Sequence, residues 1–231
     1  MKTHHPHNKG RKLPWANEIK RAFVLIRNPM KAIPSYHNFL YEFQNKLGNH
    51  STRAPVAEWI KWRDRLFFAE LKVWKNHMEY WLDNYAPENR IIVPYEHLTH
   101  PQEGPKVTAE LNEFLGKGPG VTPIPQDSVP CVWGTVVNYK NGKVPNSRKP
   151  LPKNIKFVGN YPIFPGSSRE GPKERPYTQE HLDALMKTTD ELRRKYKHEG
   201  GRLLASLEMY INEIKKASPT PDIPQPVEKK K

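Results

Sequence analysis

One short motif in this sequence has the residue types and the position needed to hold a phosphate group. Arg27, Asn28 and Pro29 directly follow an apolar run at 22–26, and Ser35 lies eight residues after the arginine. The carboxyl end of a parallel strand faces the ligand crevice of an open α/β sheet, where a following helix offers N–H groups. Arg27 would add a forked cationic donor and Ser35 a hydroxyl. The alternative is a capped helix start with a surface arginine.

Two further groups of residues could take part in chemistry. Lys2 and His4 are two residues apart, so on an extended segment both side chains point to the same face. Lysine can stabilise charge on a group in transfer, and histidine is a natural general base near neutral pH. The same histidine cluster could instead be solvated or bind a metal weakly. Tyr95 ends a second apolar run and could pack on an adenine ring or serve only as a buried aromatic.

The elements around these residues predict an α/β fold with a parallel sheet flanked by helices. The runs at 22–26 and 90–95 are short and apolar, as is typical of buried parallel strands. Apolar spacing and capping residues predict helices at about 29–46, from 55 onward, at 106–115 and at 179–195, and the pattern permits another at 201–216. A strand, two helices, a strand and a helix in this order favour a parallel sheet.

The remaining segments are expected to be irregular. The stretch 119–176 is rich in proline, glycine, asparagine and lysine, which predicts long loops over the sheet. The Pro/Lys-rich end at 217–231 is expected to be a disordered tail, which leaves a single domain at 1–216.

Composition limits the partners without naming one. The 231 residues carry a formal net charge of +14, which favours nucleotides, sulfated or phosphorylated glycans, nucleic acid or an anionic membrane, unless the surface is simply solvated. The single cysteine, Cys131, excludes an internal disulfide and a four-cysteine zinc site. No run approaches the roughly 18 apolar residues of a membrane span.

Read together, the motifs resemble the sulfotransferase family that uses 3′-phosphoadenosine 5′-phosphosulfate. Lys-Thr-His at 2–4 is similar to the family's catalytic strand, and residues 24–36 are similar to its 3′-phosphate site. Tyr-Glu-His-Leu at 95–98 resembles the family's Tyr-Glu-Asp-Leu, and Phe-Leu-Gly at 114–116 resembles the segment that follows it. Trp74, His77 and Trp81, with Cys-Val at 131–132 and Asn-Tyr-Lys at 138–140, are most similar to the WSC-domain-containing sulfotransferases.

The resemblance implies a P-loop NTPase-like sulfotransferase fold and sulfuryl transfer from this nucleotide to a hydroxyl acceptor, without a metal. It implies that His4 deprotonates the acceptor and that Lys2 stabilises the bridging oxygen. It assigns the 3′-phosphate to Arg27 and Ser35 and the adenine to Tyr95. Lys140 would close over the 3′-phosphate. Carbohydrate-acting members work in the Golgi lumen, where the sequon at 49–51 could be glycosylated.

The sequence departs from the family in one respect. The family begins with a strand and a Pro-Lys-Ser-Gly-Thr-Thr-like loop that holds the 5′-phosphosulfate, and the chain as given has no counterpart. The fold is therefore expected to be N-terminally incomplete, with an open flank on the sheet and little or no activity. The alternative function is a non-catalytic basic module that binds a nucleotide or a polyanionic glycan. A nucleic-acid-binding protein is supported only by charge.

Overall fold

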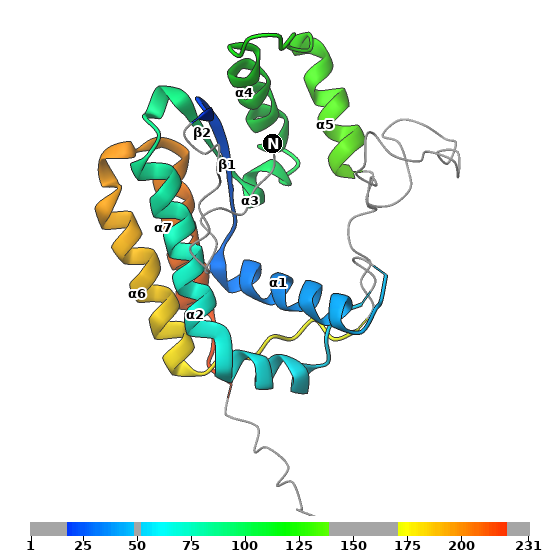
Figure 1. Cartoon of the computed structure of the whole chain (residues 1–231), viewed down its shortest axis with the longest axis vertical. Coiled ribbons are helices and arrows are strands. Elements are labelled where there is room, and N and C mark those ends of the chain that lie inside the picture. The colour runs from blue at the N-terminus through cyan, green and yellow to red at the C-terminus, as the bar shows by residue number, and fades with distance from the viewer. Residues whose placement is uncertain (1–17, 49–51, 139–170, 221–231) are drawn as a thin grey trace, which may run out of the picture.

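The computed structural model of the chain describes residues 18–48, 52–138 and 171–220. Figure 1 shows helices grouped around a two-stranded sheet. The strands are β1 (Ala22–Ile26) and β2 (Arg90–Pro94), and the helices are α1 (Pro29–Gln44), α2 (Val56–Asp83), α3 (Tyr95–Leu98), α4 (Gly104–Gly116), α5 (Val129–Asn138), α6 (Gln179–Lys195) and α7 (Gly201–Lys216). Short 3₁₀ turns lie at Pro87–Asn89, Gln126–Ser128 and Lys197–Glu199. None of the described helices is long and apolar enough to cross a membrane.

The two strands confirm the predicted parallel pairing. β1 and β2 are direct neighbours, with Ala22 opposite Arg90 and Ile26 opposite Pro94. α1 and α2 connect them, as expected for a crossover between parallel strands. The second strand was expected to run through Tyr95, but β2 ends at Pro94 and Tyr95 begins α3. The predicted α/β order is therefore present in a mostly helical molecule.

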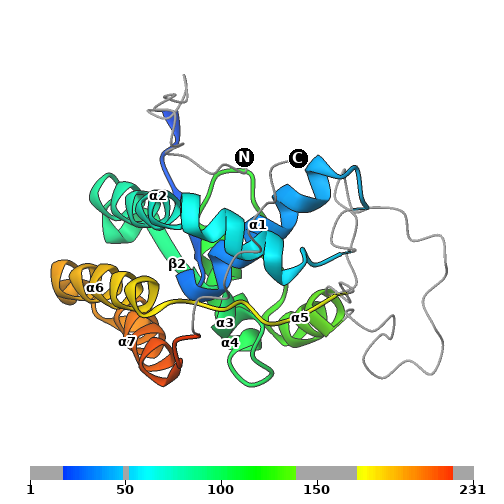
Figure 2. The same cartoon turned by 90° about the horizontal axis from the view of Figure 1, so that it is seen from below.

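Only one face of β1 is buried, which corrects the expectation of a fully buried strand. Val24 and Ile26 pack into a core formed with α2, α6 and α7, and Figure 2 shows α6 and α7 side by side in this group. On the opposite face, Phe23 and Leu25 keep 52% and 47% of their surface exposed. Val93, the register neighbour of Leu25, is fully buried, whereas Ile91, opposite Phe23, is partly buried, and α4 packs against β2. Among the described elements, none covers the corresponding face of β1, so alternate residues remain exposed.

A second core joins α1, the first half of α2 and α6. Ile33, Trp59, Phe67 and Leu185 are buried there. The side chains of Trp59 and the buried Arg63 both donate to the carbonyl of Pro176, at 3.0 and 2.9 Å. These bonds fix the extended segment that leads into α6.

The helix α5 lies inside the segment that was expected to consist only of loops. Its sequence, Val-Pro-Cys-Val-Trp-Gly-Thr-Val-Val-Asn, is rich in β-branched residues and has weak intrinsic helix propensity. Tertiary packing stabilises the helix instead, because Trp133 is buried and its indole N–H donates to the carbonyl of Leu98 at 2.7 Å. The indole lies against Gly104 at the start of α4.

The beginning of the predicted tail is ordered against the second core. The backbone N–H of Thr220 donates to the carbonyl of Tyr177 at 2.9 Å. Residues 221–231, which make up most of the predicted tail, lie outside the described residues, as do the sequon residues 49–51.

The contact between Trp133 and Gly104 leads to a stability prediction. A β-carbon at position 104 would overlap the Trp133 indole and lie 2.5 Å from the Leu98 carbonyl oxygen. Gly104→Ala should therefore displace the indole and destabilise the protein by about 1–3 kcal/mol. Urea denaturation would measure this loss, with the exposed Lys106→Ala on the same helix as the control. Equal stability of the two variants would contradict the packing of α5 on α4.

A second prediction concerns His37, which is buried against two tryptophan rings that also contact each other. Its ring centroid lies 5.5 Å from that of Trp59 and 4.9 Å from that of Trp62. Burial, and secondarily the charge of Arg175, lower the pKa of His37 to about 4. The unfolded chain has a histidine pKa of about 6.5, so it binds the proton more readily than the folded protein.

The free energy of unfolding should therefore fall as pH decreases from about 6.5 to about 4, the range in which only the unfolded His37 is protonated. His37→Phe keeps an aromatic ring against the two tryptophans and should weaken this pH dependence. Thermal unfolding of both proteins across that range is the measurement. An unchanged slope in the variant would show that His37 does not cause the acid sensitivity.

Candidate functional site

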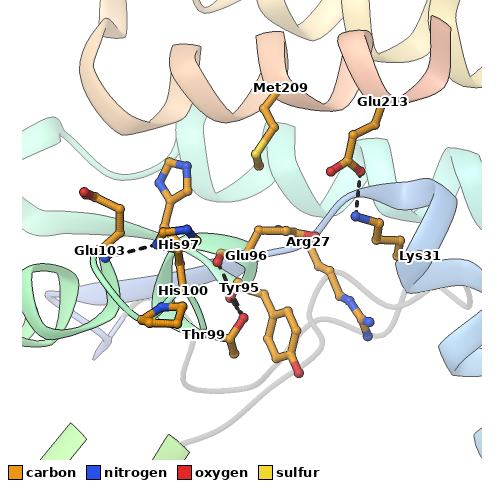
Figure 3. Close-up of a pocket in the computed structure, with 11 residues that line it drawn as sticks. Arg27, Lys31, Tyr95, Glu96, His97, Thr99, His100, Glu103, Met209 and Glu213 are labelled. Carbon is orange, nitrogen blue, oxygen red and sulfur yellow. Dashed lines mark hydrogen bonds and ion pairs between the residues drawn. The ribbon is translucent and has the colours of Figure 1, made fainter. Parts of the chain in front are cut away.

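A pocket of about 630 Å³ lies where the two parallel strands end. Arg27 follows β1, Lys31 comes from the first turn of α1, and Tyr95 begins α3 after β2. Met209 and Glu213 of α7 form another side of the pocket (Figure 3). The position agrees with the general rule that ligands of open α/β sheets bind at the carboxyl ends of the strands.

Arg27 and Tyr95, predicted from separate motifs, meet in this pocket. The guanidinium carbon of Arg27 lies 4.6 Å from the centroid of the Tyr95 ring. The Nε atom of Arg27 is buried and has no hydrogen-bond partner among the described residues. An arginine held on an aromatic face without a described carboxylate partner keeps its positive charge for an anion.

The other predicted site residues are placed differently. Ser35 does not line the pocket; it lies four residues after Lys31 and so on the same face of α1, one turn further from the strand ends. Lys2, His4 and Lys140 lie outside the described residues. The structure therefore brings together two of the six predicted residues, Arg27 and Tyr95.

The first N–H groups of α1 do not face the pocket as free donors, contrary to expectation. Pro29 has no N–H, and the N–H of Met30 donates to the Asn28 side chain at 2.9 Å. The N–H of Lys31 donates to the Asn28 carbonyl at 2.9 Å. The Asn28 N–H donates to Glu96 at 3.1 Å. Because these amides are already paired, the side chains and not the backbone supply donors for an anion.

Two carboxylates accept hydrogen bonds from Asn28, and the sequence analysis assigned no role to either of them. Its side-chain amide donates to Oε2 of Glu213 at 2.7 Å, and its backbone N–H donates to Oε1 of Glu96. The buried Tyr210 hydroxyl donates to Oε2 of Glu96 at 3.0 Å. Burial raises the pKa of Tyr210, followed by the charge of Glu96, so the hydroxyl keeps its proton. Glu213 and Tyr210 lie more than 180 residues after Asn28, and no local motif could have indicated them.

The electrostatics of the pocket depend on Arg27 and Lys31. Burial, followed by the charge of Arg202, lowers the pKa of His97, which is therefore neutral at pH 7. Lys31 pairs with Glu213 at 2.7 Å, whereas no described carboxylate is paired with Arg27. No group of metal-ligating side chains is present in the described parts of the chain. The arrangement can bind an anion beside an aromatic ring, and one face of that ring already carries the guanidinium.

The carboxylate of Glu96 should be essential for the stability of this turn. Glu96→Ala removes the acceptor for the Asn28 N–H and for the Tyr210 hydroxyl, and each group left buried without a partner costs about 1–3 kcal/mol. Urea denaturation should show this loss, while the exposed Glu208→Ala on α7 should change little. If both variants lose the same stability, the hydrogen bonds of Glu96 do not hold the turn.

Comparison with known proteins adds no further assignment, since no family model, no curated protein and no solved structure matches this chain.

Proposed function

We propose that this chain is a sulfotransferase domain and that its pocket binds the 3′-phosphoadenosine part of 3′-phosphoadenosine 5′-phosphosulfate. The observation that carries the proposal is the position of Arg27, a cation on the Tyr95 ring where two parallel strands end, with no carboxylate partner among the described residues. A guanidinium can bind the phosphate of such a nucleotide while the neighbouring aromatic ring stacks on its base. The proposal includes a P-loop NTPase-like sheet, of which β1 and β2 would be two strands.

In the proposed complex each pocket residue has one role. Arg27 would bind the 3′-phosphate through two parallel N–H donors. Tyr95 would stack on the adenine with the ring face that Arg27 leaves open. Ser35 lies one turn beyond Lys31 on the same helix face, and it would reach the phosphate only if the ligand extends along α1. Lys140 would add a further cation.

The proposed reaction transfers a sulfuryl group to a hydroxyl acceptor. The acceptor oxygen forms a bond to sulfur while the bond between sulfur and the bridging phosphate oxygen breaks, which releases adenosine 3′,5′-bisphosphate. His4 would take the acceptor proton, and Lys2 would stabilise the bridging oxygen as charge develops on it. Positioning and charge stabilisation supply the catalysis, as in phosphoryl transfer, and no metal is required. For the location of the protein in the cell, the corresponding proposal is the Golgi.

The test is the affinity of the full chain for adenosine 3′,5′-bisphosphate. Arg27→Ala should weaken binding roughly tenfold or more, because a hydrogen bond to a charged group contributes about 1.5–3 kcal/mol. Calorimetric titration would measure the affinity, and the exposed Arg65→Ala is the control for the loss of one positive charge.

A second ligand makes this test specific for the 3′-phosphate. Adenosine 5′-monophosphate lacks that group, so its affinity should be lower than that of the bisphosphate and should change little in Arg27→Ala. Unchanged affinity for the bisphosphate in that variant would place the nucleotide site elsewhere. Binding of the bisphosphate without sulfuryl transfer from labelled donor to any of a broad acceptor panel would favour the non-catalytic binding module.

A further inference from the structure

Lys31 is the second cation of the pocket, and its charge is already balanced within the protein. Its ammonium lies 2.7 Å from Oε2 of Glu213, which reaches the pocket from α7. Figure 3 shows Lys31 pointing toward Glu213, whereas Arg27 extends beside Tyr95. Within the part of the chain that the structure describes, the pocket therefore presents one cation without a carboxylate partner and one paired cation to an incoming anion.

The ion pair between Lys31 and Glu213 is open to exchange. The two side chains are 43% and 31% exposed, and an ion pair with this much solvent contact is weak. A phosphate group with a charge near −2 attracts an ammonium more strongly than a single carboxylate at the same distance. An anionic ligand can therefore compete with Glu213 for Lys31.

Glu213 can release Lys31 without loosening the turn after β1. The same Oε2 atom accepts a second hydrogen bond, from the buried side chain of Asn28 at 2.7 Å. This bond does not involve the ammonium, so it can persist when Lys31 turns to a ligand. Glu213 thus has two separable roles, as a structural acceptor for Asn28 and as the counter-ion of Lys31.

We propose that Glu213 is a positioning residue that regulates anion affinity in this pocket. Glu213 holds Lys31 in an ion pair, and it yields Lys31 to a ligand that carries a second anionic group. Arg27 would bind the first group and Lys31 the second, so the pocket favours bis-anionic ligands over mono-anionic ones. The inference rests on the proposed nucleotide site, and it specifies how that site selects its ligand.

A charge-neutral replacement separates the two roles of Glu213. In Glu213→Gln the amide oxygen can still accept from Asn28, but the attraction for Lys31 is lost. We expect this variant to bind adenosine 3′,5′-bisphosphate and inorganic pyrophosphate roughly two- to fivefold more tightly than the unmodified chain, since a weak competing ion pair is removed. A purely structural role for Glu213 would instead weaken binding.

Three controls identify the source of the gain. Glu208→Gln changes the net charge equally on the exposed side of α7, and its affinity should stay near that of the unmodified chain. Lys31→Met should weaken binding of both ligands. In the double variant Lys31→Met/Glu213→Gln, most of the gain should disappear, because the lysine that Glu213 restrained is absent.

Calorimetric titration of all five proteins with both ligands distinguishes the possible outcomes. Equal or weaker binding by Glu213→Gln, with normal bisphosphate binding by the unmodified chain, would overturn the role of Glu213 and leave the nucleotide site standing. Tighter pyrophosphate binding by Glu213→Gln without any bisphosphate binding would support the role of Glu213 and reject the nucleotide. An equal gain in affinity in Glu208→Gln would show that the effect comes from net charge alone, and it would overturn the inference. Absence of binding by every protein would overturn both.

Discussion

The hydrogen bonds of Asn28 are the interaction on which the rest of the candidate site depends. Its side chain caps α1, its backbone N–H donates to Glu96 after β2, and its amide donates to Glu213 on α7. Asn28 is completely buried, so each of these polar groups needs a partner. One residue thereby joins β1, α1, the segment after β2 and α7. Arg27 precedes it directly, and the direction of the Arg27 side chain follows from how this turn is held.

The pocket shows why net charge alone did not locate an anion site. Most arginines with a described partner are neutralised by a nearby carboxylate, as Arg90 is by Glu199, Arg193 by Asp190 and Arg202 by Glu110. These pairs stabilise contacts between or within helices and leave little charge for a ligand. Arg27 instead lies on an aromatic ring, as Arg21 does on Phe114, and no described carboxylate pairs with it. The ring attracts the cation without cancelling its charge, so the guanidinium stays available to an anion.

Local signals in the sequence predicted the main elements well. The apolar run at 22–26 and residues 90–94 of the second run are the two parallel strands, and the stripes of α2, α6 and α7 follow helical spacing. They could not predict α5, because its β-branched sequence becomes helical only through the contact of Trp133 with α4.

The candidate site was predicted only in part, for a related reason. Arg27 and Tyr95 follow strands, and the ends of paired parallel strands meet in space, so their proximity was predictable from local pattern. Glu213 reaches Asn28 across 185 residues of chain, and the sequence carries no signal for such a contact. The contacts of Asn28 also explain why the prediction of free backbone donors was wrong. A helix start was expected to offer free N–H groups, but Glu96 and the Asn28 cap already use them.

Among the described residues, one face of β1 stays largely exposed, and this explains why hydrogen bonds and not packing hold the pocket. Val24 and Ile26 anchor the strand to the core on one side, while Phe23 and Leu25 contact solvent on the other. A strand packed on one face alone is less restrained at its end than one packed on both. Apolar contacts on one side alone leave the turn after such a strand free to tilt. Hydrogen bonds to buried groups are directional, so they fix the orientation of the turn. The carboxylates that restrain Asn28 therefore replace the second layer of packing, and they also bring negative charge to the edge of an anion-binding pocket. Glu213 pairs with Lys31, and Glu96 accepts a hydrogen bond from Tyr210. Because each carboxylate already has a donor, its negative charge repels an anionic ligand less.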